Sequence, residues 1–353
     1  MKIRENVSIA SLTTMRIGGV ARYVIEITDA RDVRKAYAFA YEKDLPVWVM
    51  GGGANTIGLD DGFPGVIILN KLRGIEIQSE VAGSLILKGM GGENWDNFVA
   101  FACRRGYSGM EMLSGIPGTL GAAPVQNIGA YGQEISQVLL EVFVYDSLKD
   151  RAMRMPARAL GLGYRRSIFN TGKGVGRYFI ISVTVRLRRE QVEPPFYASL
   201  QGYIDEHHET DFSPENIRRM VLAIRGSKLP DPAVEASAGS FFKNVVLTPE
   251  EAKVASAKGY PVHQKSDGRI VLNSGWLIEK AGLSGKVFNG FKVSERAALV
   301  LINESGRSYE DLKAAREAIR EKVKEKYGFE LLQEPVELRA EKHDGVGRRG
   351  DGE

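Results

Sequence analysis

The chain contains few of the residues that build disulfides and metal sites. Its 353 residues include one cysteine, Cys103, and four histidines, His207, His208, His263 and His343. A lone cysteine excludes an internal disulfide and fits a reducing compartment. No two histidines have the H-x-x-x-H spacing of a zinc site, and no cysteine cluster assists them, so we expect no bound metal.

Long apolar runs and a strong charge of one sign are also missing. Hydrophobic residues make up 43% of the chain and charged residues 26%, and the formal net charge is only +4. No apolar run reaches the ~18 residues of a membrane-spanning helix, and residues 1–6 lack the apolar core of a signal peptide. Interspersed charges give no nucleic-acid footprint. We expect a soluble cytoplasmic protein of about two or three domains, without a nucleic-acid, membrane or obligate protein partner.

Two common phosphate-binding fingerprints are absent as well. The chain has no G-x-x-x-x-G-K-[S/T] loop, and no complete G-x-G-x-x-G motif. After Gly51-x-Gly53 the third glycine is replaced by Thr56, and the glycines of residues 115–121 are spaced three apart. A dinucleotide bound here would therefore require a fold other than the Rossmann fold.

The chain does contain two glycine-rich segments. Residues 51–56 read GGGANT and follow the apolar run 47–50, and residues 115–132 read GIPGTLGAAPVQNIGAYG. Glycine allows positive φ, lets a ligand approach the backbone and exposes N–H groups to phosphate oxygens. Two such loops predict a long ligand with more than one phosphate. For either loop alone, a tight turn is the alternative.

Hydrophobic periodicity predicts an α/β unit over residues 1–75. Strands at 23–27, 46–50 and 65–69 surround a helix that begins at Asp29 or Asp32 and ends near Tyr41. The following region has further expected strands and helices, at 84–89, 93–104, 138–145, 178–188 and 213–225.

Pro230 and Pro232 mark an expected domain boundary. Beyond them the clearest helix is 309–326, which begins after the capping residue Ser308 and ends at Gly328. Its apolar positions form one face, at 312, 315, 319 and 323. A last strand is expected over 329–338, and the polar, glycine-rich tail 341–353 is expected to be disordered.

Taken in chain order, these segments resemble the UDP-N-acetylenolpyruvoylglucosamine reductase family (the MurB family) of cell-wall biosynthesis. The resemblance extends from about Thr14 to Arg339 and depends on an ordered set of motifs. They are residues 51–55 (GGGAN), 115–132, 164–167 (YRRS), 228–232 (KLPDP), 239–244 (GSFFKN) and 337–339 (ELR).

The resemblance implies an α+β protein with α/β-like FAD subdomains. Its fold is the FAD-binding fold of the vanillyl-alcohol oxidase type, followed by a C-terminal α+β substrate-binding domain. The implied FAD subdomains are 1–75, joined by a C-terminal strand at about 329–340, and 76–229. The implied substrate-binding domain is 230–328.

The resemblance also implies FAD and NADPH as cofactors. No histidine precedes residue 207, so none in the glycine-rich half can tether the flavin covalently. The implied cofactor-binding residues are Gly51, Gly52, Gly53, Ala54, Asn55, Thr56, Ile116, Pro117, Gly118, Gly121, Ala122, Gln126, Asn127, Gly129, Ala130 and Tyr131. For the side-chain amides among them, turn stabilisation is the alternative role.

In this family, hydride passes from NADPH to FAD and then to the vinyl carbon of an enolpyruvyl ether on UDP-N-acetylglucosamine. The resemblance implies Ser240 as proton donor to the enolate carbon, and Arg165 and Glu337 as groups that stabilise the enolate. Glu334, three residues before Glu337, is the alternative register. From residue type alone, Ser240 could be a turn residue, Arg165 part of a solvated pair with Arg166, and Glu337 a water-facing side chain.

Further residues match substrate-binding positions of the family. They are Tyr164, Tyr197, Arg225, Lys228, Asn244, Tyr260 and Arg339. Tyr197 matches a loop that closes over UDP in one, tyrosine-loop, subgroup. Residues 291–297 differ from that subgroup, which carries His and Gln there, so the substrate contacts of this segment stay open.

Two rival functions remain from the sequence. One is another FAD oxidoreductase of the same fold, such as an alcohol or lactone oxidase. The other is a non-enzymatic UDP-sugar or nucleotide-binding protein, which would need the glycine loops but not Ser240, Arg165 and Glu337 together.

Overall fold

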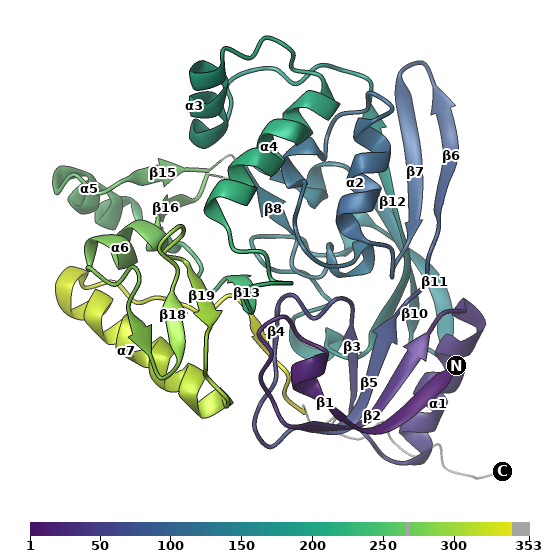
Figure 1. Ribbon diagram of the computed structural model, residues 1–353. Helices are drawn as coiled ribbons and strands as arrows, with labels where there is room; N and C mark the ends of the chain where they lie inside the picture. The colour runs from purple at the N-terminus through teal and green to yellow at the C-terminus, as the bar shows by residue number, and fades with distance from the viewer. Residues whose placement is uncertain (266–267, 341–353) are drawn as a thin grey trace.

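The computed structural model describes residues 1–265 and 268–340. The expected disordered tail, 341–353, lies outside the described residues. The chain forms three packed parts around a central region (Figure 1). No helix in the described ranges is long and apolar enough to cross a membrane.

The N-terminal part is a four-stranded sheet covered by one helix. Its order is β1-β2-β5-β3, with β1 antiparallel to β2 and the other pairs parallel. The elements are β1 (Lys2–Ser8), β2 (Val20–Ile27), α1 (Val33–Glu42), β3 (Val47–Met50) and β5 (Phe63–Asn70). The three predicted strands and the helix are confirmed. β1 was not predicted, because it is a charged edge strand with no fully buried residue and therefore shows no hydrophobic alternation.

The second part is a five-stranded antiparallel sheet of order β11-β10-β12-β7-β6. Its strands are β6 (Ile75–Val81), β7 (Ser84–Met90), β10 (Leu139–Asp146), β11 (Arg151–Pro156) and β12 (Tyr178–Arg188). The helices beside it are α2 (Trp95–Cys103), α3 (Ala198–His207) and α4 (Pro214–Lys228). Phe179 and Ile181 of β12 share a core with α1, which joins this part to the first.

The C-terminal part has two small antiparallel sheets and three helices. Its strands are β13 (Ser237–Ser240), β14 (Val245–Leu247), β15 (Val262–Gln264), β16 (Ile270–Leu272), β17 (Val287–Phe288), β18 (Phe291–Val293) and β19 (Val300–Asn303). The helices are α5 (Pro249–Ala257), α6 (Ser274–Lys280) and α7 (Tyr309–Tyr327). The predicted α7 face is confirmed, because Leu312, Ala315, Ile319 and Val323 are all buried in one core.

The segment after α7 returns to the N-terminal part. A strand over 329–338 was expected, but the strand β20 spans only Val336–Glu337 and pairs in parallel with β4 (Thr56–Ile57). The preceding residues instead bond the 241–243 segment, through Lys243 N–H to Leu332 O (2.8 Å) and Glu334 N–H to Phe241 O (2.9 Å). Pro335 has no N–H to donate, which breaks a continuous ladder.

The first turn of α7 is capped from another part of the chain. Ser308 accepts from the Asp311 N–H (3.0 Å), while the Asp60 carboxylate accepts from Tyr309 N–H (2.6 Å) and Glu310 N–H (3.1 Å). A carboxylate at a helix N-terminus satisfies free donors and complements the helix dipole. Asp60 thus links the N-terminal part to the C-terminal helix.

We expect Asp60→Ala to lower the free energy of unfolding by about 1 kcal/mol, as loss of a helix cap does. Urea denaturation followed by circular dichroism measures it. Asp61→Ala is the matched control, because its exposed side chain has no such contact among the hydrogen bonds of the described residues. Equal losses in the two variants would mean that Asp60 caps nothing.

Candidate active site

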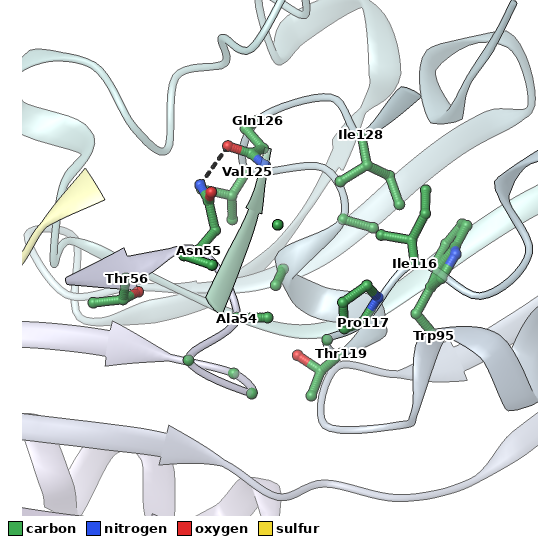
Figure 2. A pocket seen from close by; sticks show the side chains of 18 of the residues that line it. Ala54, Asn55, Thr56, Trp95, Ile116, Pro117, Thr119, Val125, Gln126 and Ile128 are labelled. Atoms are coloured by element: carbon green, nitrogen blue, oxygen red, sulfur yellow. Dashed lines mark hydrogen bonds between the residues drawn. The ribbon is translucent and has the colours of Figure 1, made fainter. Parts of the chain in front are cut away.

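A cavity of about 790 Å³ lies where the three parts meet. Both glycine segments line it, together with most of residues 229–240. The N-terminal, second and C-terminal parts therefore all contribute lining residues. Figure 2 shows the side of the cavity formed by the glycine segments, from Asn55 and Gln126 to Trp95. The volume lies in the range of small-molecule and cofactor sites.

The two glycine segments approach each other so closely that larger residues would not fit. A Cβ on Gly51 would lie 2.2 Å from the Thr119 hydroxyl oxygen, and a Cβ on Gly52 would lie 3.3 Å from the Gly118 Cα. That hydroxyl is buried and has no hydrogen-bond partner within the part of the chain that is described. Bare backbone and an unsatisfied hydroxyl at a cavity wall are what a bound phosphate group needs.

Side chains also join the two loops directly. The Asn55 amide donates to the Gln126 side-chain oxygen (2.7 Å; Figure 2). Gly115 is held at both its backbone groups: its N–H donates to Asp96 (2.6 Å), and its carbonyl accepts from Arg225 (3.1 Å). The cavity wall is therefore fixed by polar contacts before any ligand is considered.

Ser240 ends β13 at the cavity wall. A register shift separates the pairs Ser237–Ile302 and Ser240–Val300, and Gly239 inside it has φ +69°. A bulge of this kind re-aims side chains, and here all four residues of β13 line the cavity.

Arg165 lies at the tip of a tight turn that reaches the same cavity. Gly163 and Arg166 exchange backbone hydrogen bonds of 3.0 and 3.1 Å, and Arg165 between them has φ +53°. The Asn170 amide donates to the Arg165 carbonyl (3.1 Å) and holds this left-handed conformation. A non-glycine residue in that region costs of order 1 kcal/mol, which indicates a constrained position.

Arg165 forms an ion pair with Glu334 inside the cavity. The Arg165 Nε lies 2.6 Å from Glu334 Oε1, and the two side chains are only 18% and 9% exposed. Burial raises the pKa of Glu334, and the positive charges of Arg165 and Lys243 oppose that rise without cancelling it. This carboxyl can hold a proton at a higher pH than an exposed one.

Glu337 does not lie in this cavity. Its carboxylate accepts from Tyr309 Oη (2.7 Å) and Arg316 (3.0 Å), and it is also paired with Arg339. Burial raises the pKa of Glu337, but these partners outweigh it, so the pKa lies below its usual value. Glu337 therefore does not share the cavity with Ser240 and Arg165 as predicted, whereas Glu334 lines that cavity and pairs with Arg165.

The strand period explains the difference. Side chains alternate between the two faces of an extended chain, so a step of three residues changes the face. Glu334 and Val336 line the cavity, whereas Gln333 and Glu337 contact α7.

Most predicted cofactor residues line the cavity. They are Gly51, Gly52, Gly53, Ala54, Asn55, Thr56, Ile116, Pro117, Gly118, Gly121, Ala122, Gln126, Gly129 and Ala130. Asn127 and Tyr131 do not line it. Asn127 is buried and donates to Glu134 (2.7 Å) while accepting from Ser136 N–H (3.1 Å), which is a turn-stabilising role.

Of the predicted substrate residues, only Arg225 lines the cavity. Burial lowers the pKa of its guanidinium. Tyr197 packs edge-on against Tyr131 with ring centroids 5.7 Å apart, which places its loop above the 129–132 turn. Lys228 is exposed at the end of α4.

The other predicted substrate residues have partners outside the cavity. Tyr164 lies under the Arg269 guanidinium, at 4.2 Å from its ring centroid. Asn244 accepts from Ser274 N–H (3.2 Å), and Tyr260 packs against Trp276 at 5.3 Å. Arg339 pairs with Glu337, as above.

Several lining residues were not predicted. They include Trp95, Phe169, Asn170, Tyr178, Ser237, Glu235 and Arg296. Aromatic and small polar residues scattered through the chain carry no periodic signal, so only the folded chain brings them together. Arg296 lies in the segment 291–297 and is paired with Glu235.

No group of three or more His, Cys, Asp or Glu side chains suited to a metal ion occurs in the ranges 1–265 and 268–340.

Comparison with known proteins agrees with this geometry. The family model of the UDP-N-acetylenolpyruvoylglucosamine reductase C-terminal domain matches residues 231–338, and that of the FAD binding domain matches residues 21–147. The chain is 36% identical over 341 residues to the UDP-N-acetylenolpyruvoylglucosamine reductase of Chromobacterium violaceum, covering 96% of this chain and 99% of that one. It is also 36% identical to the same-named protein of Pseudomonas aeruginosa, covering 95% and 98%.

A solved structure shares the fold. The crystal structure of UDP-N-acetylenolpyruvylglucosamine reductase (MurB) from Thermus caldophilus superimposes with a TM-score of 0.62 at 24% identity, covering 95% of this chain and 99% of that chain. The predicted fold class is confirmed: an FAD-binding domain of the vanillyl-alcohol oxidase type precedes the C-terminal domain.

Fold and cavity together define a flavin-dependent oxidoreductase. The chain belongs to the UDP-N-acetylenolpyruvoylglucosamine reductase family of peptidoglycan synthesis. The residues present fit FAD, since two side-chain-free backbone loops and the orphan Thr119 hydroxyl face a cavity of about 790 Å³. Gly51–Thr56 and Gly115–Gly132 would hold the cofactor.

We expect Gly52→Ala to weaken FAD binding about 10-fold or more, because its methyl group would enter the narrow gap between the two loops. Titration of the apoprotein with FAD, followed by flavin fluorescence, gives the dissociation constant. Gly202→Ala in α3 is the control, since a Cβ there meets no atom within 4 Å. FAD affinity that is unchanged in Gly52→Ala would show that the cofactor does not approach this loop.

Proposed function

We propose that this chain reduces the enolpyruvyl ether of UDP-N-acetylglucosamine to UDP-N-acetylmuramate, with NADPH as reductant, in the cytoplasm. One observation carries the proposal beyond family membership: Ser240, Arg165 and Glu334 line the same cavity as both glycine loops. A nucleotide-binding protein without chemistry would have no need for a hydroxyl, a guanidinium and a buried carboxyl in one cavity. The Tyr131–Tyr197 contact supports assignment to the tyrosine-loop subgroup.

The domain limits inferred from the sequence are part of this proposal. They are FAD subdomains at 1–75 and 76–229 and a substrate domain at 230–328. The boundary near residue 230 is supported by the C-terminal family model, which begins at 231, whereas the FAD-binding model matches 21–147 and spans both proposed FAD subdomains. β20 returns to pair with β4, in the first of these units.

When bound, FAD would supply the hydride chemistry, accepting from NADPH and delivering to the vinyl carbon. Negative charge then develops on the adjacent carbon and its carboxylate. Arg165 would bind that carboxylate, because its planar fork offers two parallel donors to two oxygens. The constrained turn fixes the guanidinium before substrate arrives, so little reorganisation is needed as charge develops.

Ser240 would deliver the proton to the charged carbon. A hydroxyl is a weak acid in water, so it needs a nearby positive charge to favour the alkoxide form. Lys243 lies three residues further along the chain, and its positive charge is felt at Glu334. We propose Lys243 as the source of that positive charge.

We assign to Glu334 the role that the motif gave to Glu337. Substrate carboxylate on Arg165 would compete with Glu334 for the same guanidinium. Glu334 would then lose its neutralising partner while staying buried, and its pKa would rise further. A protonated Glu334 can donate a hydrogen bond to the enolate oxygen and keep its proton, while Ser240 supplies the one proton that the carbon takes up. The ionised Glu337 has no proton to share.

We expect Glu334→Gln to slow flavin reoxidation by the enolpyruvyl substrate about 10²-fold, the loss typical of a general acid. In the parent enzyme this rate should fall as pH rises through the raised pKa of Glu334, since only the protonated carboxyl donates. Glu334→Gln has no such proton and should lose that pH limb. Anaerobic stopped-flow absorbance over a pH series measures both.

Glu337→Gln is the matched control, and its reoxidation rate should still fall as pH rises through the pKa of Glu334. A pH limb that disappears in Glu337→Gln but persists in Glu334→Gln would restore the motif's original assignment.

We expect Ser240→Ala to block reoxidation by about 10²–10⁴-fold while leaving reduction by NADPH unchanged, because only the second half-reaction needs the proton. The two half-reactions are measured separately: NADPH is added anaerobically, then the enolpyruvyl substrate. Parallel slowing of both half-reactions in the variant would make Ser240 structural.

The same experiment on the parent protein tests the proposed function. Reduction by NADPH followed by substrate-dependent reoxidation is expected, whereas an oxidase would use oxygen instead.

A further inference from the structure

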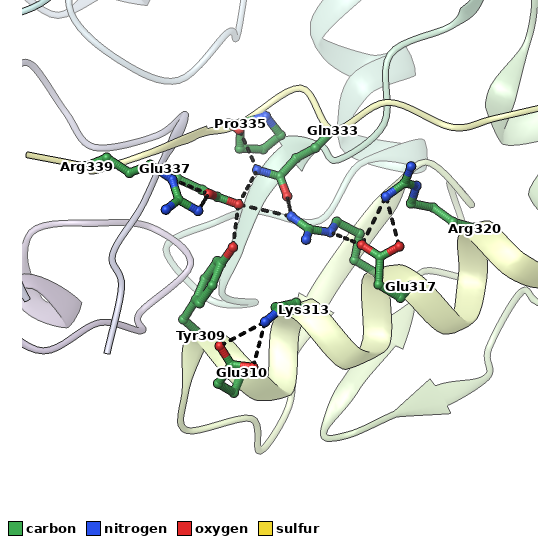
Figure 3. Close-up of polar contacts among 10 residues, drawn as sticks. Tyr309, Glu310, Lys313, Glu317, Arg320, Gln333, Pro335, Glu337 and Arg339 are labelled. Carbon is green, nitrogen blue, oxygen red and sulfur yellow. Dashed lines mark hydrogen bonds and ion pairs between the residues drawn. The ribbon is translucent and has the colours of Figure 1, made fainter. Parts of the chain in front are cut away.

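A second cluster of charged residues lies outside the cavity, between α7 and the segment that follows it (Figure 3). Glu337 is at its centre, with Tyr309, Arg316 and Arg339 as donors. The Arg316 and Glu337 side chains are only 15% and 14% exposed. Arg339 is the exposed member, at 60%. A network whose centre is buried, and which has no ligand-binding role in the proposed reaction, calls for another explanation.

Arg316 is the one member of this cluster that contacts both ends of the 333–337 segment. Its Nη1 donates to Gln333 Oε1 (2.7 Å) and to Glu337 Oε1 (3.0 Å). These two residues lie on either side of Glu334 in the sequence and share the face opposite to it. One guanidinium on a rigid helix therefore fixes both flanks of the segment that carries the cavity carboxyl.

Gln333 connects the residues on the two sides of Glu334. Its amide nitrogen donates to the carbonyl of Pro335 (2.8 Å), which closes a ring around residue 334. Arg316, by bonding the oxygen of the same amide, sets which way the amide points. Without Arg316, the amide oxygen loses its donor, and only the contacts of the amide nitrogen with Pro335 O (2.8 Å) and Glu337 Oε1 (3.5 Å) hold the ring.

Backbone contacts alone hold Glu334 only in part. Its N–H donates to Phe241 O (2.9 Å), and the next backbone bond along the segment is Val336 N–H to Asn55 O (2.9 Å). Pro335 between them has no N–H. The carboxyl that faces Arg165 thus lies on a stretch with few backbone bonds, so side-chain contacts add to these bonds in holding its orientation.

We propose that Arg316 is a positioning residue for the reaction: through Gln333 and Glu337 it holds Glu334 against Arg165. The inference rests on the proposed role of Glu334. Arg316 itself touches neither the cavity nor the predicted ligands. Its removal should act only on the step that uses Glu334.

The test compares Arg316→Met with Arg320→Met. Both arginines lie on α7 and pair with Glu317, at 2.9 Å and 2.8 Å, but only Arg316 reaches Gln333 and Glu337. We expect Arg316→Met to slow flavin reoxidation by the enolpyruvyl substrate about 10-fold, since a small misplacement of a catalytic group costs that much or more. FAD affinity and reduction by NADPH should stay within about two-fold, and Arg320→Met should match the parent.

A double-mutant cycle separates positioning from general damage. In a Glu334→Gln background, Arg316→Met should cause no further slowing, because the group it positions is already gone. Gln333→Met should repeat the loss and the non-additivity, and it serves as the second variant if Arg316→Met folds poorly.

Three results would overturn the inference: multiplicative losses in the double variant, equal losses in Arg316→Met and Arg320→Met, or unchanged reoxidation in Arg316→Met. If Glu334→Gln itself reoxidises at the parent rate, the proposed role of Glu334 fails, and the inference fails with it. If Glu334→Gln is slow but Arg316→Met is not, only the positioning role fails.

Discussion

The parallel pairing of β20 with β4 is the constraint on which the rest of the site depends. It is only two residues long, Val336–Glu337 against Thr56–Ile57, yet it joins the C-terminal part to the strand that follows the first glycine loop. Asn55, whose amide bonds Gln126 in the second loop, also accepts the Val336 N–H. The same contact therefore links the cofactor loops to the segment carrying Glu334. Because so few backbone bonds hold β20, it needs further contacts. Helix α7 supplies them through Arg316, which bonds Glu337, and Asp60 caps the first turn of that helix.

Two carboxyl groups three residues apart, those of Glu334 and Glu337, have pKa values shifted in opposite directions because their surroundings differ. Glu334 faces a cavity with one ion-pair partner, and burial raises its pKa. Glu337 faces α7 and accepts from four side chains, those of Tyr309, Arg316, Gln333 and Arg339, and its pKa is lowered. A reaction that must hold a proton beside a developing negative charge needs the first environment. The second environment suits a permanent ion that organises structure. Neither property belongs to the residue type, since both residues are glutamates.

Much of the fold followed from the sequence because its signals are local. The 1–75 unit, the long strand β12 and the capped helix α7 each show strong periodicity or clear end signals. β1 and the two-residue β20 do not, because a charged edge strand and a strand broken by Pro335 have no hydrophobic alternation to detect. The glycine loops were found at the cavity because glycine spacing is visible in sequence. Trp95 and Tyr178 were not, since distant elements bring them there.

The choice between Glu334 and Glu337 could not be made from the sequence for a specific reason. Motif resemblance locates a glutamate to within a few residues, but the face that a strand residue presents changes with every single step. Which of the two faces the cavity depends on tertiary partners: the Lys243–Leu332 and Glu334–Phe241 backbone bonds fix the register, and residues 334 and 336 line the cavity. Those partners are 89 and 93 residues away in sequence, so no local pattern encodes the outcome. The proposed role of Glu334 thus depends on tertiary pairing, so the residues that secure this pairing matter to the proposed site as much as those that line it.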